Sequence, residues 1–180
     1  MNPISTLGFL GLTWLGKPAC NRSIYKAIQK YRCRSIVEVG LGSGERALSM
    51  IRVARKFAVT SNIRYTGIDM FDARTTDPLP LIEMHRNLQI EGVKSQLVPG
   101  TAGPGIARIA NSHVRTDLVI LSSGTEDHEL AGCWFYLPRM LHSTSLVMLQ
   151  RNDGGKFECL NRLQVEKLAN KGTGQSVKAA

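Results

Sequence analysis

The segment Ser35–Glu45 constrains this chain more than any other part of its sequence, because three glycines alternate at its end. Its first half is a run of isoleucine and valine interrupted by one acid, Glu38, which is typical of a buried strand. Gly40, Gly42 and Gly44 then permit the positive φ angles of a sharp turn. A helix that starts after such a turn presents unpaired N–H groups to a ligand. The segment therefore predicts a strand, a turn and a helix that hold a nucleotide-like ligand.

The spacing of the glycines narrows the kind of ligand. Dinucleotide-binding turns have the pattern G-x-G-x-x-G, in which the third glycine allows close packing of the helix on the strand. Here the pattern is G-x-G-x-G, and Glu45 stands where the dinucleotide pattern requires glycine. A carboxylate in the first helical turn would also repel a pyrophosphate group. The spacing therefore disfavours a dinucleotide.

The bulk composition fits one globular domain. A chain of 180 residues with 43% hydrophobic content can bury a sizeable core. No apolar run approaches the roughly 18 residues that span a bilayer, so we expect no membrane partner. Residues 7–15 are apolar, but no basic residue precedes them, so we expect no export signal. The four cysteines lack a C-x-x-C pair, and we expect reduced thiols and a cytoplasmic protein.

The net charge of +9 is concentrated at the two ends of the chain. Residues 1–37 hold six basic side chains and no acid, and residues 151–180 hold six basic and three acidic side chains. Clustered positive charge can attract an acidic partner such as RNA. Aromatic residues make up only 6% of the chain, however, which favours a solvated basic face over a nucleic-acid site.

We divide the chain into an N-terminal arm (1–16), loosely ordered or lid-like, one domain (17–172) and a polar tail (173–180).

Hydrophobic periodicity predicts strands that alternate with helices. The predicted strands are 35–39, 63–69, 95–98, 117–121 and 145–149. The predicted helices are 18–31, 45–57, one capped by Asp77 and ending at Gly92, 104–110, 127–141, and 157–171 closed by Gly172. This alternation predicts an α/β fold with a doubly wound, mostly parallel sheet.

Polar or flexible residues stand at the carboxyl ends of four predicted strands. In a doubly wound sheet, right-handed crossovers place these ends along one edge, where the ligand crevice lies. Glu38, Asp69, Gly100–Thr101 and Ser122 occupy the four ends. The sequence therefore predicts that these residues converge on one crevice.

The acid and alternate glycines resemble motif I of the class I S-adenosylmethionine (SAM) methyltransferases, whose turn holds the methionine moiety. The resemblance covers roughly residues 18–153 and implies a Rossmann-like sheet of order 3-2-1-4-5. It implies SAM as cofactor and S-adenosylhomocysteine (SAH) as product. Asp69 matches the acid that binds the ribose hydroxyls, and Thr101 replaces the acid that the family commonly has beside adenine. The implied cofactor site comprises Glu38, Gly40, Leu41, Gly42, Ser43, Gly44, Asp69, Met70, Thr101, Ala102 and Ser122.

Segments 117–121 and 137–141 are similar to small-molecule O-methyltransferases of the catechol type, but their metal ligands are absent. The predicted fourth strand ends in Ser122-Ser123-Gly124 without a carboxylate. The fifth continues into Gln150–Asp153, where an Asn-Asp pair is displaced by two residues and reversed. Hard cations prefer several oxygen ligands, so we expect no metal site. The family's last two antiparallel strands are expected to be reduced or missing, which would leave an open sheet edge or a dimer contact.

The catalytic residue is less well defined. His128 is the one histidine near the predicted crevice and is a weak candidate for a general base; the alternative is a polar residue that starts a helix. His85, His113 and His142 are expected to be structural or exposed. Trp14, Trp134 and Tyr136 could line an acceptor pocket, although their aromatic character favours apolar packing.

Three functions remain open at this stage. The first is a metal-independent SAM-dependent methyltransferase acting on an unknown small molecule or acidic macromolecule. The second is a SAM-fold binding or assembly module without turnover, and the third is a basic nucleic-acid-binding protein. The sequence identifies neither the acceptor nor the oligomeric state, and a homodimer stays open.

Overall fold

A central β-sheet organises the computed structural model, which describes residues 4–58, 62–122, 127–150 and 155–176, without the side chains of 127–129 and 171–176. Within these residues the sheet has six strands in the order β3-β2-β1-β4-β5-β6. The strands are β1 (Ser35–Val39), β2 (Arg64–Asp69), β3 (Lys94–Pro99), β4 (Thr116–Leu121), β5 (Leu141–Gln150) and β6 (Phe157–Asn161). β1 to β5 pair in parallel, and β6 pairs antiparallel with β5.

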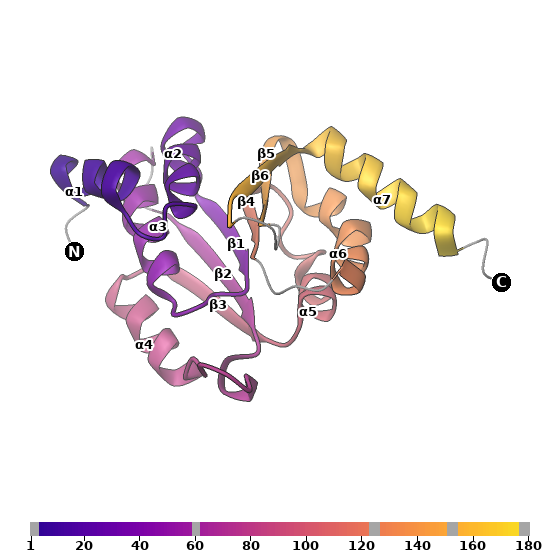
Figure 1. Ribbon diagram of the computed structural model, residues 1–180, viewed down its shortest axis with the longest axis horizontal. Coiled ribbons are helices and arrows are strands. Elements are labelled where there is room, and N and C mark those ends of the chain that lie inside the picture. The colour runs from indigo at the N-terminus through magenta and orange to yellow at the C-terminus, as the bar shows by residue number, and fades with distance from the viewer. Residues whose placement is uncertain (1–3, 59–61, 123–126, 151–154, 177–180) are drawn as a thin grey trace.

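Helices cover both faces of the sheet (Figure 1). Those on one face are α1 (Thr6–Leu10), the π-helix η1 (Gly11–Leu15), α2 (Asn21–Tyr31), α3 (Glu45–Phe57) and α4 (Leu81–Ile90). Those on the other are α5 (Ala102–Ile109), α6 (Asp127–Met140) and α7 (Arg162–Ser176), and the short 3-10 helix η2 (Phe71–Ala73) follows β2. In the described part of the chain, no helix has the length and apolar character needed to cross a membrane.

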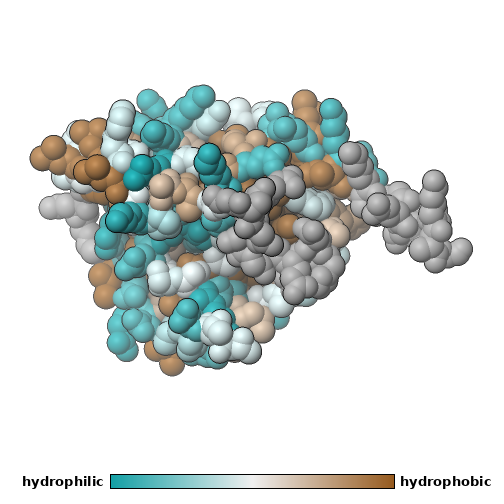
Figure 2. Space-filling model, in the orientation of Figure 1, coloured by the Kyte–Doolittle hydropathy of each residue, from teal (hydrophilic) through white to brown (hydrophobic). Residues whose placement is uncertain are grey.

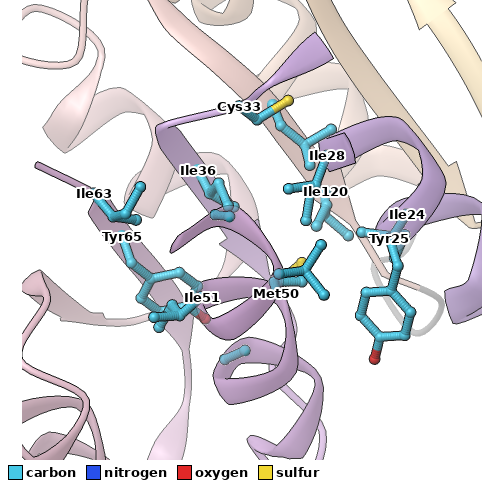
Figure 3. Packing of buried hydrophobic residues seen from close by; sticks show 14 of the residues in the cluster. Ile24, Tyr25, Ile28, Cys33, Ile36, Met50, Ile51, Ile63, Tyr65 and Ile120 are labelled. Carbon is cyan, nitrogen blue, oxygen red and sulfur yellow. The ribbon is translucent and has the colours of Figure 1, made fainter. Parts of the chain in front are cut away.

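Alternate residues of the central strands feed two separate hydrophobic cores. Ile36 of β1 and Ile120 of β4 pack with Ile24 and Ile28 of α2 on one face (Figure 3). Val37 and its neighbours on the same strands pack on the other face, against α5, α6 and α7. Because both faces are covered, β1 is buried along its whole length, which explains its continuous apolar pattern.

The predicted fold class, parallel order and crossover pattern are confirmed, and β1 and α3 have the predicted bounds. Three local predictions are wrong. Residues 6–15 form a helix docked through the buried side chain of Phe9, where a loose arm was expected. Residues 157–161 form the antiparallel strand β6, and α7 continues past Gly172 to Ser176. Within the described residues, β6 therefore extends the sheet by one antiparallel strand beside β5.

The predicted start of α4 is also wrong. Asp77 does not cap this helix, because its φ angle is 48° and the helix begins four residues later, at Leu81. The backbone N–H of Leu81 instead donates to Oδ2 of Asp72, at 3.1 Å. The helix start is therefore capped from across a loop.

Candidate functional site

The turn after β1 has the left-handed backbone that its glycines predict. Gly40, Gly42 and Gly44 have φ angles of 76°, 62° and 82°. A Cβ at Gly44 would lie 2.8 Å from Sδ of Met84, and one at Gly40 would lie 3.1 Å from Cβ of Ser122. A Cβ at Gly42 would meet nothing within 4 Å. Two of the glycines thus permit close packing, whereas Gly42 leaves its side of the turn open.

A buried ion pair supports this turn. Glu38 is inaccessible to solvent, and its Oε1 accepts a 2.6 Å hydrogen bond from Nε of Arg46, in the first turn of α3. Nη2 of Arg46 donates to the carbonyl of Gly40, at 2.7 Å, and to Oγ of Ser122. The hydroxyl of Tyr65 donates to the other oxygen of Glu38. Arg46 therefore connects β1, the turn and the end of β4.

The Glu38 carboxylate shifts the pKa values of both side chains that bond to it. Burial opposes the charge of Arg46, but the Glu38 carboxylate outweighs it and raises the pKa of the guanidinium. Burial and the same carboxylate raise the pKa of the Tyr65 hydroxyl well above its usual value. Tyr65 therefore stays a neutral hydrogen-bond donor to Glu38 across the physiological pH range.

A cavity of about 1220 Å³ opens at the carboxyl ends of the parallel strands. The glycine turn, the end of β2, the start of α5 and the end of β4 contribute to its wall, as the crevice prediction required. Eight of the residues predicted for the cofactor site line it: Gly40, Gly42, Ser43, Asp69, Met70, Thr101, Ala102 and Ser122. Glu38, Leu41 and Gly44 do not line it, and Glu38 faces the Arg46 side chain instead. Their roles in binding a cofactor stay predictions.

Asp69, the last residue of β2, faces the glycine turn. Its Oδ2 accepts a 2.7 Å hydrogen bond from the N–H of Leu41, and its Oδ1 accepts a 2.9 Å bond from the N–H of Phe71. Burial opposes its ionisation, yet hydrogen bonds from Arg74 and the two backbone N–H groups lower the pKa of its carboxyl. Asp69 is therefore an ionised acceptor at the cavity wall.

Arg74 is a site residue that sequence reasoning missed. Its Nε donates to Oδ1 of Asp69 at 2.5 Å, and its Nη2 pairs with Oδ2. Its Nη1 donates to the carbonyls of Gly42, at 2.7 Å, and Asp77, at 3.2 Å. The one available signal was a cation five residues after the strand-end acid, in a segment without clear periodicity.

Residues 70–80, here called the β2–α4 loop, form a large part of the cavity wall. The loop contributes Met70, Ala73, Arg74, Thr75, Thr76, Asp77, Pro78, Leu79 and Pro80. Arg74 ties it to the opposite glycine turn through Gly42. The position of this loop therefore decides how wide the cavity is beside Asp69.

The other predicted candidates lie away from the cavity or outside the described residues. Nε2 of His113 lies 2.7 Å from Oγ1 of Thr66, Nε2 of His142 lies 2.9 Å from Oδ1 of Asp117, and His85 is exposed, so these histidines have the structural or exposed roles expected of them. Trp14 is 68% exposed, with Nζ of Lys26 5.4 Å from the centre of its ring. Trp134 and Tyr136 pack against the core formed with α5–α7. The side chain of His128, and all of residues 123–124 and 152–153, lie outside the described residues.

Metal-ligating side chains do not cluster in the described part of the chain: it holds no group of three or more His, Cys, Asp or Glu residues that could bind a metal ion. The described end of β4 carries Ser122, whose Oγ accepts from Arg46.

Comparison with solved structures finds similar folds among methyltransferases. The SAH-bound methyltransferase PaMTH1 of Podospora anserina matches 98% of this chain and 81% of its own length, with a TM-score of 0.52 and 14% identity. The O-methyltransferase TomG of Streptomyces achromogenes, solved with SAM, matches 92% of this chain and 75% of its own length, with a TM-score of 0.53 and 12% identity. The chain has the fold of the class I SAM-dependent methyltransferases. The prediction from motif I is thereby confirmed at the level of the fold.

Two further matches differ in how much of the matched chain they cover. Cofactor-bound Rv0187 from MTB matches 97% of this chain and 86% of its own length, with a TM-score of 0.53 and 15% identity. The chain spans only 36% of the length of another matched methyltransferase, at a TM-score of 0.48. No protein-family model matches the sequence, and no curated protein does. At these identities the comparisons concern the fold alone.

Proposed function

We propose that this protein is a SAM-dependent methyltransferase that binds its cofactor in the cavity at the carboxyl ends of the sheet. One observation carries the proposal: the left-handed glycine turn and the ionised Asp69 face the same cavity, in a sheet with the methyltransferase strand order. Two solved proteins with this fold are bound to SAH and SAM.

The chemistry of the cavity wall fits the three parts of this cofactor. Gly42 leaves open space at the turn, three residues before α3 begins at Glu45, for the methionine part of the cofactor. Asp69 can accept hydrogen bonds from a ribose diol, as carboxylates do strongly. Thr101 and Ala102 line the wall where the adenine ring would lie. Ligand cavities are typically about 300–1,000 Å³ in volume, so the space suffices for the cofactor and an acceptor.

The cofactor supplies an electrophilic methyl group on a sulfonium, and the protein contributes positioning and exclusion of water. Arg46, fixed by Glu38, holds the Gly40 carbonyl and the end of β4 in place. We assign Glu38 to this supporting role, without contact to the cofactor. We further propose that transfer is metal-independent, because Ser122 stands where the catechol-type enzymes have a carboxylate.

Titration calorimetry with SAH tests the binding proposal. We expect the wild type to bind SAH, and Asp69→Asn to bind it at least about tenfold more weakly, because the charge-assisted acceptor is lost. Asp72→Asn is the matched control, since Asp72 lies nearby, caps α4 and does not line the cavity. Absence of SAH binding by the folded wild type would refute the proposal. Transfer of label from methyl-labelled SAM that persists in EDTA supports metal independence, and transfer abolished by EDTA contradicts it.

A binding module without turnover is the second candidate. Two observations favour it: Thr101 replaces the adenine-side acid, and Arg74 already occupies the carboxylate of Asp69. Incubation with methyl-labelled SAM and cell extract distinguishes the two candidates. Label transferred to an acceptor by the wild type, and not by Asp69→Asn, supports the enzyme; SAH binding without any transfer supports the module.

A further inference from the structure

The carboxylate of Asp69 has no remaining capacity for a ribose diol in this structure. Oδ1 accepts from the N–H of Phe71 and from Nε of Arg74, and Oδ2 accepts from the N–H of Leu41 and from Nη2 of Arg74. An ionised carboxylate offers about four lone-pair positions, and all four have donors here. A ligand that donates two hydroxyls to Asp69 must therefore replace two of these donors.

The two donors from Arg74 are the replaceable ones. The N–H groups of Leu41 and Phe71 belong to the backbone of the glycine turn and of η2, which are fixed by their own hydrogen bonds. Arg74 in contrast reaches Asp69 through a flexible side chain that is 17% exposed, and solvent can rehydrate a guanidinium that leaves the carboxylate. Its Nη1 bonds to the Gly42 and Asp77 carbonyls do not involve Asp69.

We propose that Arg74 competes with the ribose diol of the cofactor for Asp69, and so sets the affinity of the site and couples cofactor binding to movement of the β2–α4 loop. The inference rests on the proposed function and deepens it. The exchange conserves the hydrogen-bond count at Asp69, since two N–H donors leave and two O–H donors arrive. The contribution of the diol to the affinity is then the difference between two charge-assisted interactions. In a site without Arg74, the diol replaces only water at Asp69.

The same exchange affects the rest of the β2–α4 loop. Six further residues of the same loop, Thr75 to Pro80, line the wall, and Arg74 is the side chain that ties the loop to Gly42 and Asp69. Release of Arg74 therefore loosens this wall only when a diol-bearing ligand is present. Binding of the cofactor would then precede movement of the β2–α4 loop.

The test measures three ligands against two proteins by calorimetry: SAH, adenosine and 2′,3′-dideoxyadenosine against wild type and Arg74→Met. Methionine keeps the length of the side chain and removes its charge and donors. We expect Arg74→Met to bind SAH and adenosine about tenfold more tightly, in line with loss of a competing charge-assisted hydrogen bond. Dideoxyadenosine has no diol to offer Asp69, so its affinity should change less than that of adenosine.

Two further variants keep the result interpretable. Arg52→Met removes a cation whose side chain is 47% exposed and which does not line the cavity; its partner Glu91 keeps Arg55, so all three affinities should stay unchanged. Arg74→Lys retains a cation with one donating group and should give an intermediate SAH affinity, which tests the competition even where Arg74→Met does not fold.

The outcomes separate the two proposals. If the wild type binds SAH and the Arg74 variants bind it equally or more weakly, Arg74 is a neutral or direct ligand contact and the competition is refuted. Equal gains for adenosine and dideoxyadenosine also refute it, because the diol would then play no part. If no protein in the series binds SAH, the proposed function itself fails.

Discussion

Arg46 and Glu38 form an ion pair, 2.6 Å between Nε and Oε1, that joins the first turn of α3 to the middle of the sheet beside the glycine turn. Glu38 has no solvent access, and Arg46 is largely buried. The acid of the motif therefore acts through a partner eight residues later: Arg46 lines the cavity, and Glu38 does not.

Arg46→Met should destabilise the protein severely, because it leaves the Glu38 carboxylate buried without a cation. Removing one partner of a buried pair costs about 3–5 kcal/mol. Urea denaturation of the purified variant measures the loss in free energy of unfolding. The exposed pair of Arg162 and Glu166 on α7 provides the control, and Arg162→Met should lose no more than about 1 kcal/mol. Equal effects at both sites would contradict the importance of burial.

Gly42→Ala should lower the affinity for SAH, with only a modest loss in the free energy of unfolding. The φ angle of 62° makes any side chain unfavourable by about 1–2 kcal/mol, but no protein atom lies within 4 Å of the added methyl group, which enters the ligand space. Gly92 is a matched control, since its φ angle is 61°, its Cβ would also meet nothing within 4 Å, and it does not line the cavity. Both alanine variants should lower the melting temperature similarly, and only Gly42→Ala should lower the SAH affinity. A parallel loss of affinity in Gly92→Ala would point to a general folding defect.

The sequence was sufficient to predict those parts of the fold that depend on local patterns. β1 and α3 were bounded correctly because apolar runs, glycines and helical spacing all mark the same positions. The convergence of Asp69, Gly100–Thr101 and Ser122 on one cavity followed from the geometry of a parallel sheet, whereas Glu38, which was predicted with them, does not line it. These inferences use periodicity and topology, which a single sequence contains.

The failures share a different cause, which is pairing that leaves no periodic pattern in the sequence. β6 shows one buried residue in five, Leu160, so no alternating pattern marks it, and its identity as a strand depends on pairing with β5. The cap of α4 comes from Asp72 across a loop, although Asp77-Pro78 is the better local signal. Arg74 could not be assigned because its four acceptors are brought together only by the tertiary fold.

The ion pair of Asp69 with Arg74 should make stability depend on acid pH. The pKa of Asp69 is lower in the folded protein than in the unfolded chain, so the pair stabilises the protein fully above the unfolded value. As the pH falls below about 4, the unfolded chain takes up the proton first, and this contribution is lost. Denaturation curves of wild type and Arg74→Met between neutral pH and pH 3 should therefore converge toward the acid end. A constant difference in unfolding free energy across this range would contradict the assignment.

The N-terminal helix offers a pair of adjacent tests, because its two sides differ in burial. Phe9 is buried, and its ring lies 4.8 Å from that of Phe57 at the end of α3, centre to centre. Leu7 is 82% exposed, and Figure 2 shows hydrophobic side chains gathered at the end of the molecule that α1 forms. Phe9→Ala should reduce the free energy of unfolding by about 3 kcal/mol, since it empties a packed position.

Leu7→Ala should change this free energy by no more than about 0.5 kcal/mol, as surface substitutions do. Hydrogen exchange of the α1 amides gives a local measurement beside the global one, and should accelerate in Phe9→Ala alone. If both variants match the wild type in stability and exchange, the segment behaves as the loose arm that the sequence indicated. A loss confined to Phe9→Ala instead establishes residues 6–15 as part of the folded domain, because only docking against α3 distinguishes the two positions.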